Sequence, residues 1–245
     1  MHLFFAEHHN ISGNEILLDG TDYNHIKNVL RLKAGSIIQV KSGDNKVYSC
    51  HIKDFGECAV ICEIDGVSEQ DSELPVKVSI FQGLPKAEKM ETVIQKTIEL
   101  GAVRIVPVAM ERSITRLDEK KAENKLKRWR TIAKAAAEQS KRSMVPEVSD
   151  VCDLKEALRQ ASEYDKILMP YECAEGFEHT RKVLADIRPG DSVAVFIGPE
   201  GGIASGELEA AKEAGAEIIS LGRRILRTET AALMLMSVMI YLFEE

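Results

Sequence analysis

Short apolar or alternating segments fill the first seventy positions of the chain. Five of them, separated by polar or glycine-containing turns, span residues 3–5, 15–18, 36–41, 47–53 and 59–64. Apolar residues at every second position are typical of strands with one buried face. Short strands at this spacing predict a small β-barrel, interrupted by one helix over 22–30 that Thr21 or Asp22 caps.

From residue 74 onward, apolar strands alternate with segments of helical period. The predicted strands span residues 76–82, 103–109, 166–169, 193–197 and 216–221. The predicted helices span residues 86–100, 119–140, 154–161, 180–187 and 230–242, with one more beginning at Ser205. This alternation predicts an α/β domain with a mainly parallel sheet and helices on both faces. We therefore expect two domains, 1–70 and 74–245, joined by the polar stretch 68–73.

The last predicted helix differs from the others because apolar residues surround almost its whole circumference. Its apolar positions include Ala231, Leu235, Val238 and Leu242. A helix of this kind must be buried. The pattern supports burial in the core of the domain and burial at a subunit interface equally.

Composition is that of an ordinary globular protein, with 44% hydrophobic and 29% charged residues among 245. No segment approaches the ~20 apolar residues that a membrane span requires, and the N-terminus lacks the pattern of a signal peptide. None of the five cysteines forms a Cys-x-x-Cys pair, so we expect no metal site and free thiols. These features predict a cytoplasmic protein that does not enter a membrane.

Charge is distributed unevenly along the chain. The net charge is −7, but residues 119–142 carry nine basic side chains against three acidic ones. A basic segment inside an acidic protein is typical of a phosphate-binding surface. The other interpretation is a solvated helix face, and the sequence favours neither.

Two glycine-containing loops near the C-terminus carry the strongest indication of a binding site. The loop 198–202, Gly-Pro-Glu-Gly-Gly, follows one predicted strand, and 222–227, Gly-Arg-Arg-Ile-Leu-Arg, follows another. Open α/β sheets bind ligands beyond the carboxyl ends of their strands. The glycine patterns of dinucleotide-binding and phosphate-binding loops are absent. These loops therefore predict a different small-molecule site, unless the first is only a tight turn.

The same two loops resemble those of a known family. The segments FIGPEGG and LGRRILRTETA are similar to motifs of the SPOUT class of S-adenosylmethionine-dependent RNA methyltransferases. They are most similar to the RsmE family, the 16S ribosomal RNA uridine-N3 methyltransferases. Further similar positions extend over essentially the full chain: His25, 29–31, Gln95, Lys96, 99–101, 111–113, Arg128, Trp129, Glu138, Gln139 and Arg142. Asn28 departs from the family, in which an arginine is common at this position.

The resemblance implies a fold and a cofactor. The first domain would be a PUA-like RNA-binding β-barrel, and the second a SPOUT domain tied in a deep trefoil knot. S-adenosylmethionine would bind in the knot, and the last helix would pack in a homodimer. The residues implied to bind the cofactor are Leu168, Met169, Ile197, Gly198, Pro199, Glu200, Gly201, Gly202, Leu221, Gly222, Arg223, Ile225, Leu226 and Thr230.

The resemblance also implies a reaction on 16S ribosomal RNA in the small ribosomal subunit. The imide nitrogen of uridine is a poor nucleophile until it loses its proton, so a base or stabilising cations would help. Arg227 is the first candidate for electrostatic stabilisation, although it could instead pair with Glu200 or Glu229. Glu200 could act as the base or offset the sulfonium charge. Glu138 and Arg142 could reach the substrate, and the base is left unassigned.

The residues implied to hold the RNA backbone are Arg31, Lys33, Arg112, Arg128, Arg130 and Arg142. Three alternatives remain open. The protein could bind RNA without catalysis, methylate another base or a ribose, or be a metabolic enzyme with no RNA partner. Only the last predicts no salt-dependent RNA affinity.

Overall fold

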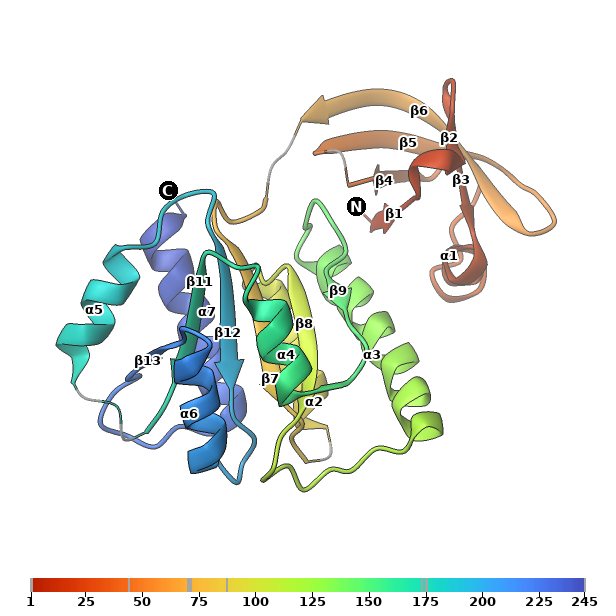
Figure 1. Ribbon diagram of the computed structural model, residues 1–245. Coiled ribbons are helices and arrows are strands. Elements are labelled where there is room, and N and C mark those ends of the chain that lie inside the picture. The colour runs from red at the N-terminus through yellow and green to blue at the C-terminus, as the bar shows by residue number, and fades with distance from the viewer. Residues whose placement is uncertain are drawn as a thin grey trace. The chain divides into compact units, whose positions relative to one another are not determined.

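The computed structural model describes residues 2–43, 45–69, 72–86, 88–172, 174 and 176–244 (Figure 1). Asp44 of a predicted turn, Gln70 and Asp71 of the predicted linker, and Ala87 of a predicted helix lie outside the described residues. The chain forms two compact units. One contains Met1–Glu73 and Ala137–Val145, and the other contains Leu74–Ala136 and Pro146–Glu245.

The first unit is built on a mixed six-stranded sheet. Its strands are β1 (His2–Phe5), β2 (Ile11–Ser12), β3 (Glu15–Asp19), β4 (Ile37–Lys41), β5 (Lys46–Phe55) and β6 (Ala59–Glu69). The strand order is β1-β4-β5-β6-β3-β2, and only the β1–β4 pair is parallel. Alternate residues of β3 and β4, such as Ile16 and Ile38, are fully buried, as the period of two predicts.

The helical segment of this unit begins earlier than predicted. Helix α1 (Gly20–Asn24) follows Asp19, and a π-helical turn, His25–Val29, continues it. Gly20 has a φ of +55°, a conformation that glycine adopts without strain. The glycine therefore lets the chain turn from β3 directly into the helix, ahead of the predicted caps at Thr21 and Asp22.

The second unit is built on a parallel seven-stranded sheet. Its strands are β7 (Lys77–Gly83), β8 (Arg104–Ala109), β9 (Glu147–Val148), β10 (Cys152–Asp153), β11 (Lys166–Pro170), β12 (Ser192–Ile197) and β13 (Glu217–Ile219). The order is β10-β8-β7-β12-β11-β13, with β9 beside β8. The short strands β9 and β10 were not predicted, and β13 is shorter than its predicted range.

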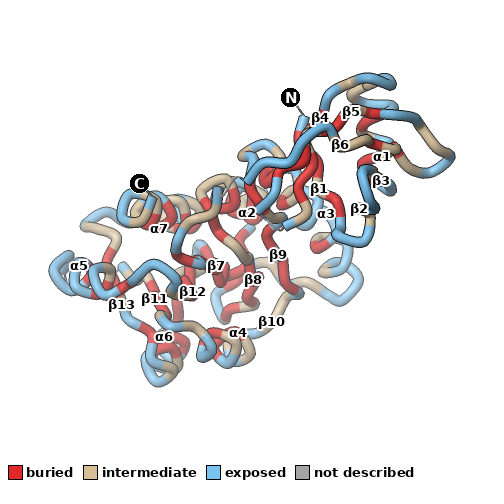
Figure 2. Tube along the Cα trace, turned by 90° about the horizontal axis from the view of Figure 1, so that it is seen from above, coloured by how far each residue is buried: buried red, intermediate tan, exposed pale blue. Residues whose placement is uncertain are grey.

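Helices cover both faces of this sheet. They are α2 (Lys89–Glu99), α3 (Glu119–Gln139), α4 (Leu154–Ala161), α5 (Phe177–Ala185), α6 (Ser205–Glu213) and α7 (Thr228–Phe243). In Figure 1, α4 and α6 lie in front of the sheet, while α2 and α7, which contact each other, lie behind it. Two covered faces explain why β12 is apolar from residue 193 to its end, and why Figure 2 shows the central strands largely as buried.

Aromatic stacking joins the two central strands of this sheet. Phe81 of β7 and Phe196 of β12 are directly opposite each other in the register, and their stacked rings have centroids 4.6 Å apart. Both side chains are almost fully buried. Offset aromatic pairs stabilise a core beyond the area they bury, so this pair fixes β12 beside β7 close to the strand ends from which the candidate site is built.

The last helix buries one face and leaves another exposed. Ala232, Leu235, Met236 and Met239 are fully buried, whereas the side chain of Tyr241 is 86% exposed. The helix therefore contributes to the core of its unit, which is one of the two possibilities left open by the sequence. No helix in the described part of the chain is both long and apolar enough to cross a membrane.

The described cysteines differ in burial: Cys50 and Cys62 are buried, Cys152 is half-buried and Cys58 is exposed, while Cys173 lies outside the described residues. Burial raises the pKa of Cys50 and Cys62 to about 12, with a smaller contribution from neighbouring Asp65 and Cys50 respectively. Cys58 is exposed.

The burial of the thiols predicts how they react with iodoacetamide. The thiolate is the reactive species, so at pH 8 iodoacetamide should label Cys58 in the folded protein and leave Cys50 and Cys62 unlabelled. Peptide mass spectrometry checks this, with urea-unfolded protein as the control. Equal labelling of Cys50 and Cys58 in the folded state would contradict it.

Candidate active site

Three loops enclose a pocket of about 470 Å³ at the carboxyl ends of β11, β12 and β13. Residues 170–172 leave β11, residues 198–203 leave β12, and residues 221–228 connect β13 to α7. Lys89 of α2 and Ala231 of α7 complete the lining. The pocket thus lies at the sheet edge where open α/β sheets bind ligands, and all of its residues belong to the second unit.

The glycines of the first loop allow two segments to approach closely. A Cβ atom on Gly201 would lie 2.8 Å from the carbonyl oxygen and 2.9 Å from the Cβ of Arg112, in the segment after β8. Gly202 has a φ of +73°, and its amide closes a turn by donating to the carbonyl of Pro199. The loop is therefore more than a generic turn, because its glycines bring it against a second backbone segment.

A cluster of charges lies at one wall of the pocket. The Lys89 ammonium is 3.0 Å from the Glu200 carboxylate and 3.7 Å from that of Glu229. The backbone amide of Lys86 donates to both oxygens of Glu200 at 3.1 and 3.3 Å. Lys89 was not among the predicted site residues. The sequence placed Lys89 in a predicted helix, but it gave no indication of its ion-pair partners, which lie more than a hundred residues further along the chain.

The pKa of the Glu200 carboxyl is lowered from 4.5 by this environment. Burial opposes ionisation, but hydrogen bonds from its own amide, the Lys89 ammonium and the Lys86 amide outweigh it. Glu200 is therefore a carboxylate at neutral pH and a weak proton acceptor. This favours a role in offsetting positive charge over a role as general base.

The lowered pKa gives a prediction for the pH dependence of Glu200→Gln. Since Glu200 stays ionised from about pH 6 to 9, its replacement should lower kcat/KM by about tenfold at every pH in this range. The inflections of the pH–rate profile should stay where they are in the wild type. Initial rates across this range test the prediction, and loss of an inflection in the variant would instead identify Glu200 as the base.

Arg227 lines the pocket and is exposed to solvent. It occupies the position directly before the first residue of α7. Within the described part of the chain, neither Glu200 nor Glu229 pairs with it, and both carboxylates lie within 3.7 Å of the Lys89 ammonium instead. The alternative role for Arg227, an ion pair with either acid, is therefore not what the structure shows.

Most of the residues predicted to bind the cofactor line this pocket: Ile197, Gly198, Pro199, Glu200, Gly201, Gly202, Leu221, Gly222, Ile225 and Leu226. Four others do not line it, although residues one or two positions away from each of them do. Leu168 and Met169 are fully buried within β11, and the residues that follow them, Pro170 and Tyr171, reach the pocket. Arg224 lines it in place of Arg223.

The fourth difference, at Thr230, follows from helical geometry. Helix α7 begins at Thr228, two residues before the predicted start. Positions three residues apart share a helix face, so Thr228 and Ala231 both line the pocket, whereas Thr230 is exposed. The boundary of the helix thus decides which threonine reaches the site.

The structure distributes the predicted RNA-binding residues over both units. Arg31 and Lys33 are exposed in the first unit, and Arg31 has a φ of +53°. In the second unit, the Arg112 guanidinium donates to the carbonyl of Gly201 at 3.3 Å. Arg112 is therefore placed at the candidate cofactor loop.

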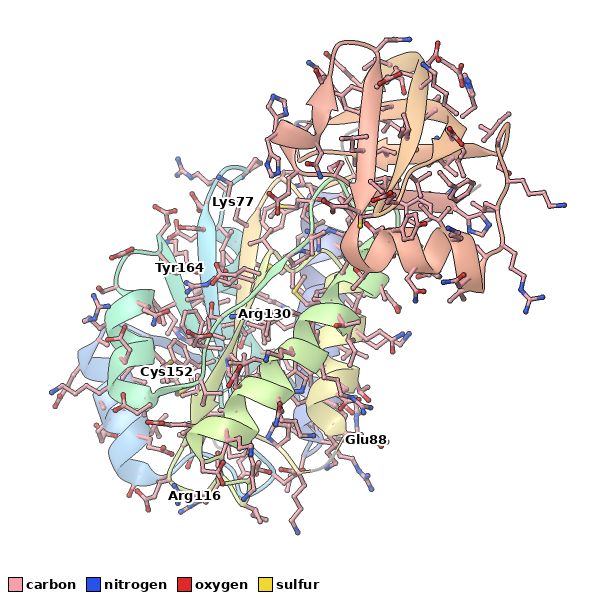
Figure 3. The ribbon with its side chains drawn as sticks, turned by 90° about the vertical axis from the view of Figure 1, so that its right-hand side faces the viewer. Lys77, Glu88, Arg116, Arg130, Cys152 and Tyr164 are labelled. Atoms are coloured by element: carbon pink, nitrogen blue, oxygen red, sulfur yellow. The ribbon has the colours of Figure 1, made fainter. Side chains whose placement is uncertain are left out.

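The basic residues of α3 are largely paired. Arg128 lies 2.7 Å from Glu91, and Arg130, labelled in Figure 3, lies 2.9 Å from Asp150. The Arg128 and Arg130 side chains remain more than half exposed in these pairs. Exposed ion pairs contribute little stability, so an RNA phosphate could replace either carboxylate. The pairing nevertheless reduces the excess positive charge that the sequence indicated.

Arg142 and Glu138 belong to the first unit, whereas the pocket belongs to the second. The Arg142 side chain is 2% exposed, and its guanidinium forms an ion pair with Glu73. Glu73 also accepts a hydrogen bond from the amide of Ser143 at 2.8 Å. A guanidinium held in this way is not presented to an RNA backbone. These contacts of Arg142 are structural, and the role in substrate binding that the resemblance implied stays a prediction.

Comparison with known proteins places the architecture in a family. Residues 72–240 match the family model of an RNA methyltransferase domain, and residues 18–65 match that of an RNA methyltransferase PUA domain. A relative from Bacillus subtilis, the ribosomal RNA small subunit methyltransferase E, is 38% identical over 91% of this chain and 89% of its own.

Solved structures agree with this assignment over the whole chain. A methyltransferase from Legionella pneumophila in complex with bound S-adenosylmethionine has a TM-score of 0.88 and 30% identity, covering 98% of this chain and 97% of its own. Methyltransferase E from Neisseria gonorrhoeae, bound to S-adenosylmethionine, has a TM-score of 0.84 and 33% identity, covering 99% and 98%. The predicted α/β fold with a PUA-like N-terminal unit is confirmed, and the chain belongs to the ribosomal RNA small subunit methyltransferase E family.

Proposed function

We propose that this protein transfers a methyl group from S-adenosylmethionine to N3 of a uridine in 16S ribosomal RNA of the small ribosomal subunit. The observation that carries the proposal is the pocket, where the two motif loops meet beside Arg227, which is exposed and has no carboxylate partner among the described residues. The small-subunit methyltransferase relatives support the RNA substrate, and the PUA-like unit supports RNA binding. Two structural relatives that bind S-adenosylmethionine support the cofactor.

The residues that line the pocket fit this cofactor. Its volume lies within the range of ligand sites, and it combines apolar side chains with loop backbone and a few charges. Ile197, Leu221 and Leu226 offer apolar surface for a flat ring, and backbone groups of the glycine loop can recognise its polar edge. The Glu200 carboxylate supplies negative charge for a cationic ligand. Leu168 and Met169 act by shaping β11, while direct contacts by Arg223 and Thr230 remain predictions.

When bound, S-adenosylmethionine supplies a methyl group on a positively charged sulfur. The chain's task is then to hold the target nitrogen in line with that methyl group and to exclude water. Arg227 stabilises the negative charge that the uracil ring acquires as its N3 proton passes to solvent water or to the unassigned base. Glu200, fixed by Lys89 and the Lys86 amide, offsets positive charge inside the pocket. Glu138 stays a predicted substrate contact.

The target base must leave its stack to reach such a pocket. We assign the RNA backbone contacts to the exposed residues Arg31, Lys33, Arg112, Arg128 and Arg130, and we assign Arg142 to the ion pair with Glu73. The exposed side chains Tyr241 and Leu242 at the end of α7 suit a homodimer interface. A trefoil knot in the second unit is part of the same proposal.

A methyl-transfer assay tests the function directly. The protein is incubated with S-adenosylmethionine and small ribosomal subunits from a strain that lacks the corresponding methyltransferase. The digested RNA is then analysed for modified nucleosides by mass spectrometry. New 3-methyluridine is expected. A different methylated nucleoside would refute the N3 assignment, and no methylation together with no cofactor binding would refute the enzymatic function.

A further inference from the structure

A polar side chain, that of Gln82, is fully buried in the sheet next to the pocket. Gln82 is the sixth residue of β7, and its side chain is 0% exposed. It does not line the pocket. Burying an amide among apolar neighbours is unfavourable unless its hydrogen bonds are made, so the partners of Gln82 indicate what the residue does.

The Gln82 amide begins a directed chain of hydrogen bonds. Its Nε2 donates to the hydroxyl of Thr228 at 2.8 Å and to the backbone carbonyl of Gly83, the next residue in the chain, at 2.9 Å. The Thr228 hydroxyl in turn donates to the carbonyl of Gly198 at 2.6 Å. Since a hydroxyl carries one proton, the donation from Gln82 leaves that proton directed at Gly198. The chain connects β7, the start of α7 and the first residue of the glycine loop.

The other end of the same amide is left unsatisfied. Among the described residues, no group donates a hydrogen bond to Oε1 of Gln82, although this atom is buried. Exchanging the amide's oxygen and nitrogen would not help, because Oε1 would then face the carbonyl oxygen of Gly83. An unpartnered buried oxygen costs about as much as a lost hydrogen bond. The NH2 group of Gln82 therefore satisfies the Gly83 carbonyl and the Thr228 hydroxyl, while its unpartnered oxygen lowers local stability.

We propose that Gln82 is a positioning residue for methyl transfer, which acts through the Thr228 hydroxyl on both loops of the pocket. Gly198 opens the glycine loop, and Arg227 directly precedes Thr228. The buried Gln82 amide thus holds Thr228, which follows the second loop, and through it the Gly198 carbonyl at the start of the glycine loop. The reaction that Gln82 serves is the proposed function, and its effect on the loops is a property of the fold.

Four variants test the chain of hydrogen bonds. Gln82→Leu removes the donor and the unpartnered oxygen together, so it should fold with a Tm equal to or above that of the wild type. Thr228→Val keeps the shape of threonine without its hydroxyl. Each is expected to lower kcat about tenfold and to weaken S-adenosylhomocysteine binding severalfold, consistent with one lost hydrogen bond. The double variant should be no worse than either single variant, because both break the same chain. Thr228→Ser should restore wild-type values within about twofold.

Ser79→Ala is the matched control. Ser79 is 1% exposed on the same strand, and its hydroxyl accepts a hydrogen bond from Tyr164 at 3.0 Å, away from the pocket. This variant should lose stability without loss of kcat. Wild-type kinetics in Gln82→Leu, or additive losses in the double variant, would overturn the proposal. If Gln82→Leu does not fold, the proposal is tested by comparing kcat and S-adenosylhomocysteine affinity between Thr228→Val and Thr228→Ser.

A second measurement keeps this proposal separate from the function on which it rests. Backbone amide hydrogen exchange of residues 198–203 and 226–230 is measured without ligand. Faster exchange in Gln82→Leu and Thr228→Val, but not in Ser79→Ala, is expected if the amide holds both loops. Unchanged exchange would overturn the positioning role. Failure of the wild type to bind S-adenosylhomocysteine or methylate RNA would refute the proposed function, and exchange would still decide the role of Gln82.

Discussion

Replacing Arg227 by alanine is expected to lower kcat for methyl transfer by about 100-fold or more, because one preorganised charge at the reacting group contributes this much. The affinity for S-adenosylmethionine should change by less than about threefold, since Arg227 acts on charge that develops only in the transition state. Its guanidinium has no carboxylate partner within the described part of the chain and can therefore turn toward substrate. Single-turnover rates and calorimetric Kd values separate the two effects.

The control for this experiment is Arg181→Ala. Arg181 is an exposed arginine on α5 and does not line the pocket, so its loss removes the same charge from the same unit. Its kcat should stay within about twofold of the wild type. Equal losses of kcat and of cofactor affinity in Arg227→Ala would contradict the electrostatic role and assign Arg227 to the architecture of the loop.

Replacing Gly201 by alanine is expected to weaken S-adenosylmethionine binding by about 10- to 100-fold, the size of an overpacking effect of roughly 1–3 kcal/mol. The added Cβ would lie 2.8 Å from the carbonyl oxygen of Arg112. Because the obstacle is backbone, the glycine loop and the segment after β8 must separate. The loop forms one wall of the pocket, so the displacement should change binding more than global stability. Calorimetric Kd and thermal unfolding measure the two quantities.

Gly206→Ala is the matched glycine control. Gly206 is the second residue of α6, only five residues further along, and a Cβ there meets nothing within 4 Å. Alanine in a helix should leave binding unchanged and raise stability by about 0.5–1 kcal/mol. Wild-type affinity in Gly201→Ala would show that the glycine loop can move away from Arg112 without loss of binding free energy. The close approach of the two segments would then have no role in binding.

Local periodicity predicted the secondary structure of the second unit well. All five predicted strands, 76–82, 103–109, 166–169, 193–197 and 216–221, have counterparts with ends within two residues. Such runs are informative because a strand covered on both faces must be apolar throughout. The short strands β9 and β10 were not predicted, because two residues carry no period. Helix ends were less accurate, and the start of α7 at Thr228 changed which threonine reaches the pocket.

The candidate site was readable in part because its loops are continuous in sequence. Residues 198–202 and 222–227 follow predicted strands directly, so the rule for open α/β sheets is enough to locate them from the order of residues alone. Residues that join the site from elsewhere were not found in this way. Lys89 reaches Glu200 from α2, and Gln82 reaches Thr228 across 146 positions. Neither residue belongs to a motif that would mark it.

The sequence by itself determined the types and order of the longer elements and the position of the two loops that form the pocket. Each follows from residues only a few positions apart. The tertiary structure decided which charged and polar groups meet. Arg142 pairs with Glu73, and Lys89 rather than Arg227 is the described cation that pairs with Glu200 and Glu229. Ion pairs and hydrogen bonds act over a few ångströms, so they depend on the path of the folded chain and leave no periodic signal in the sequence.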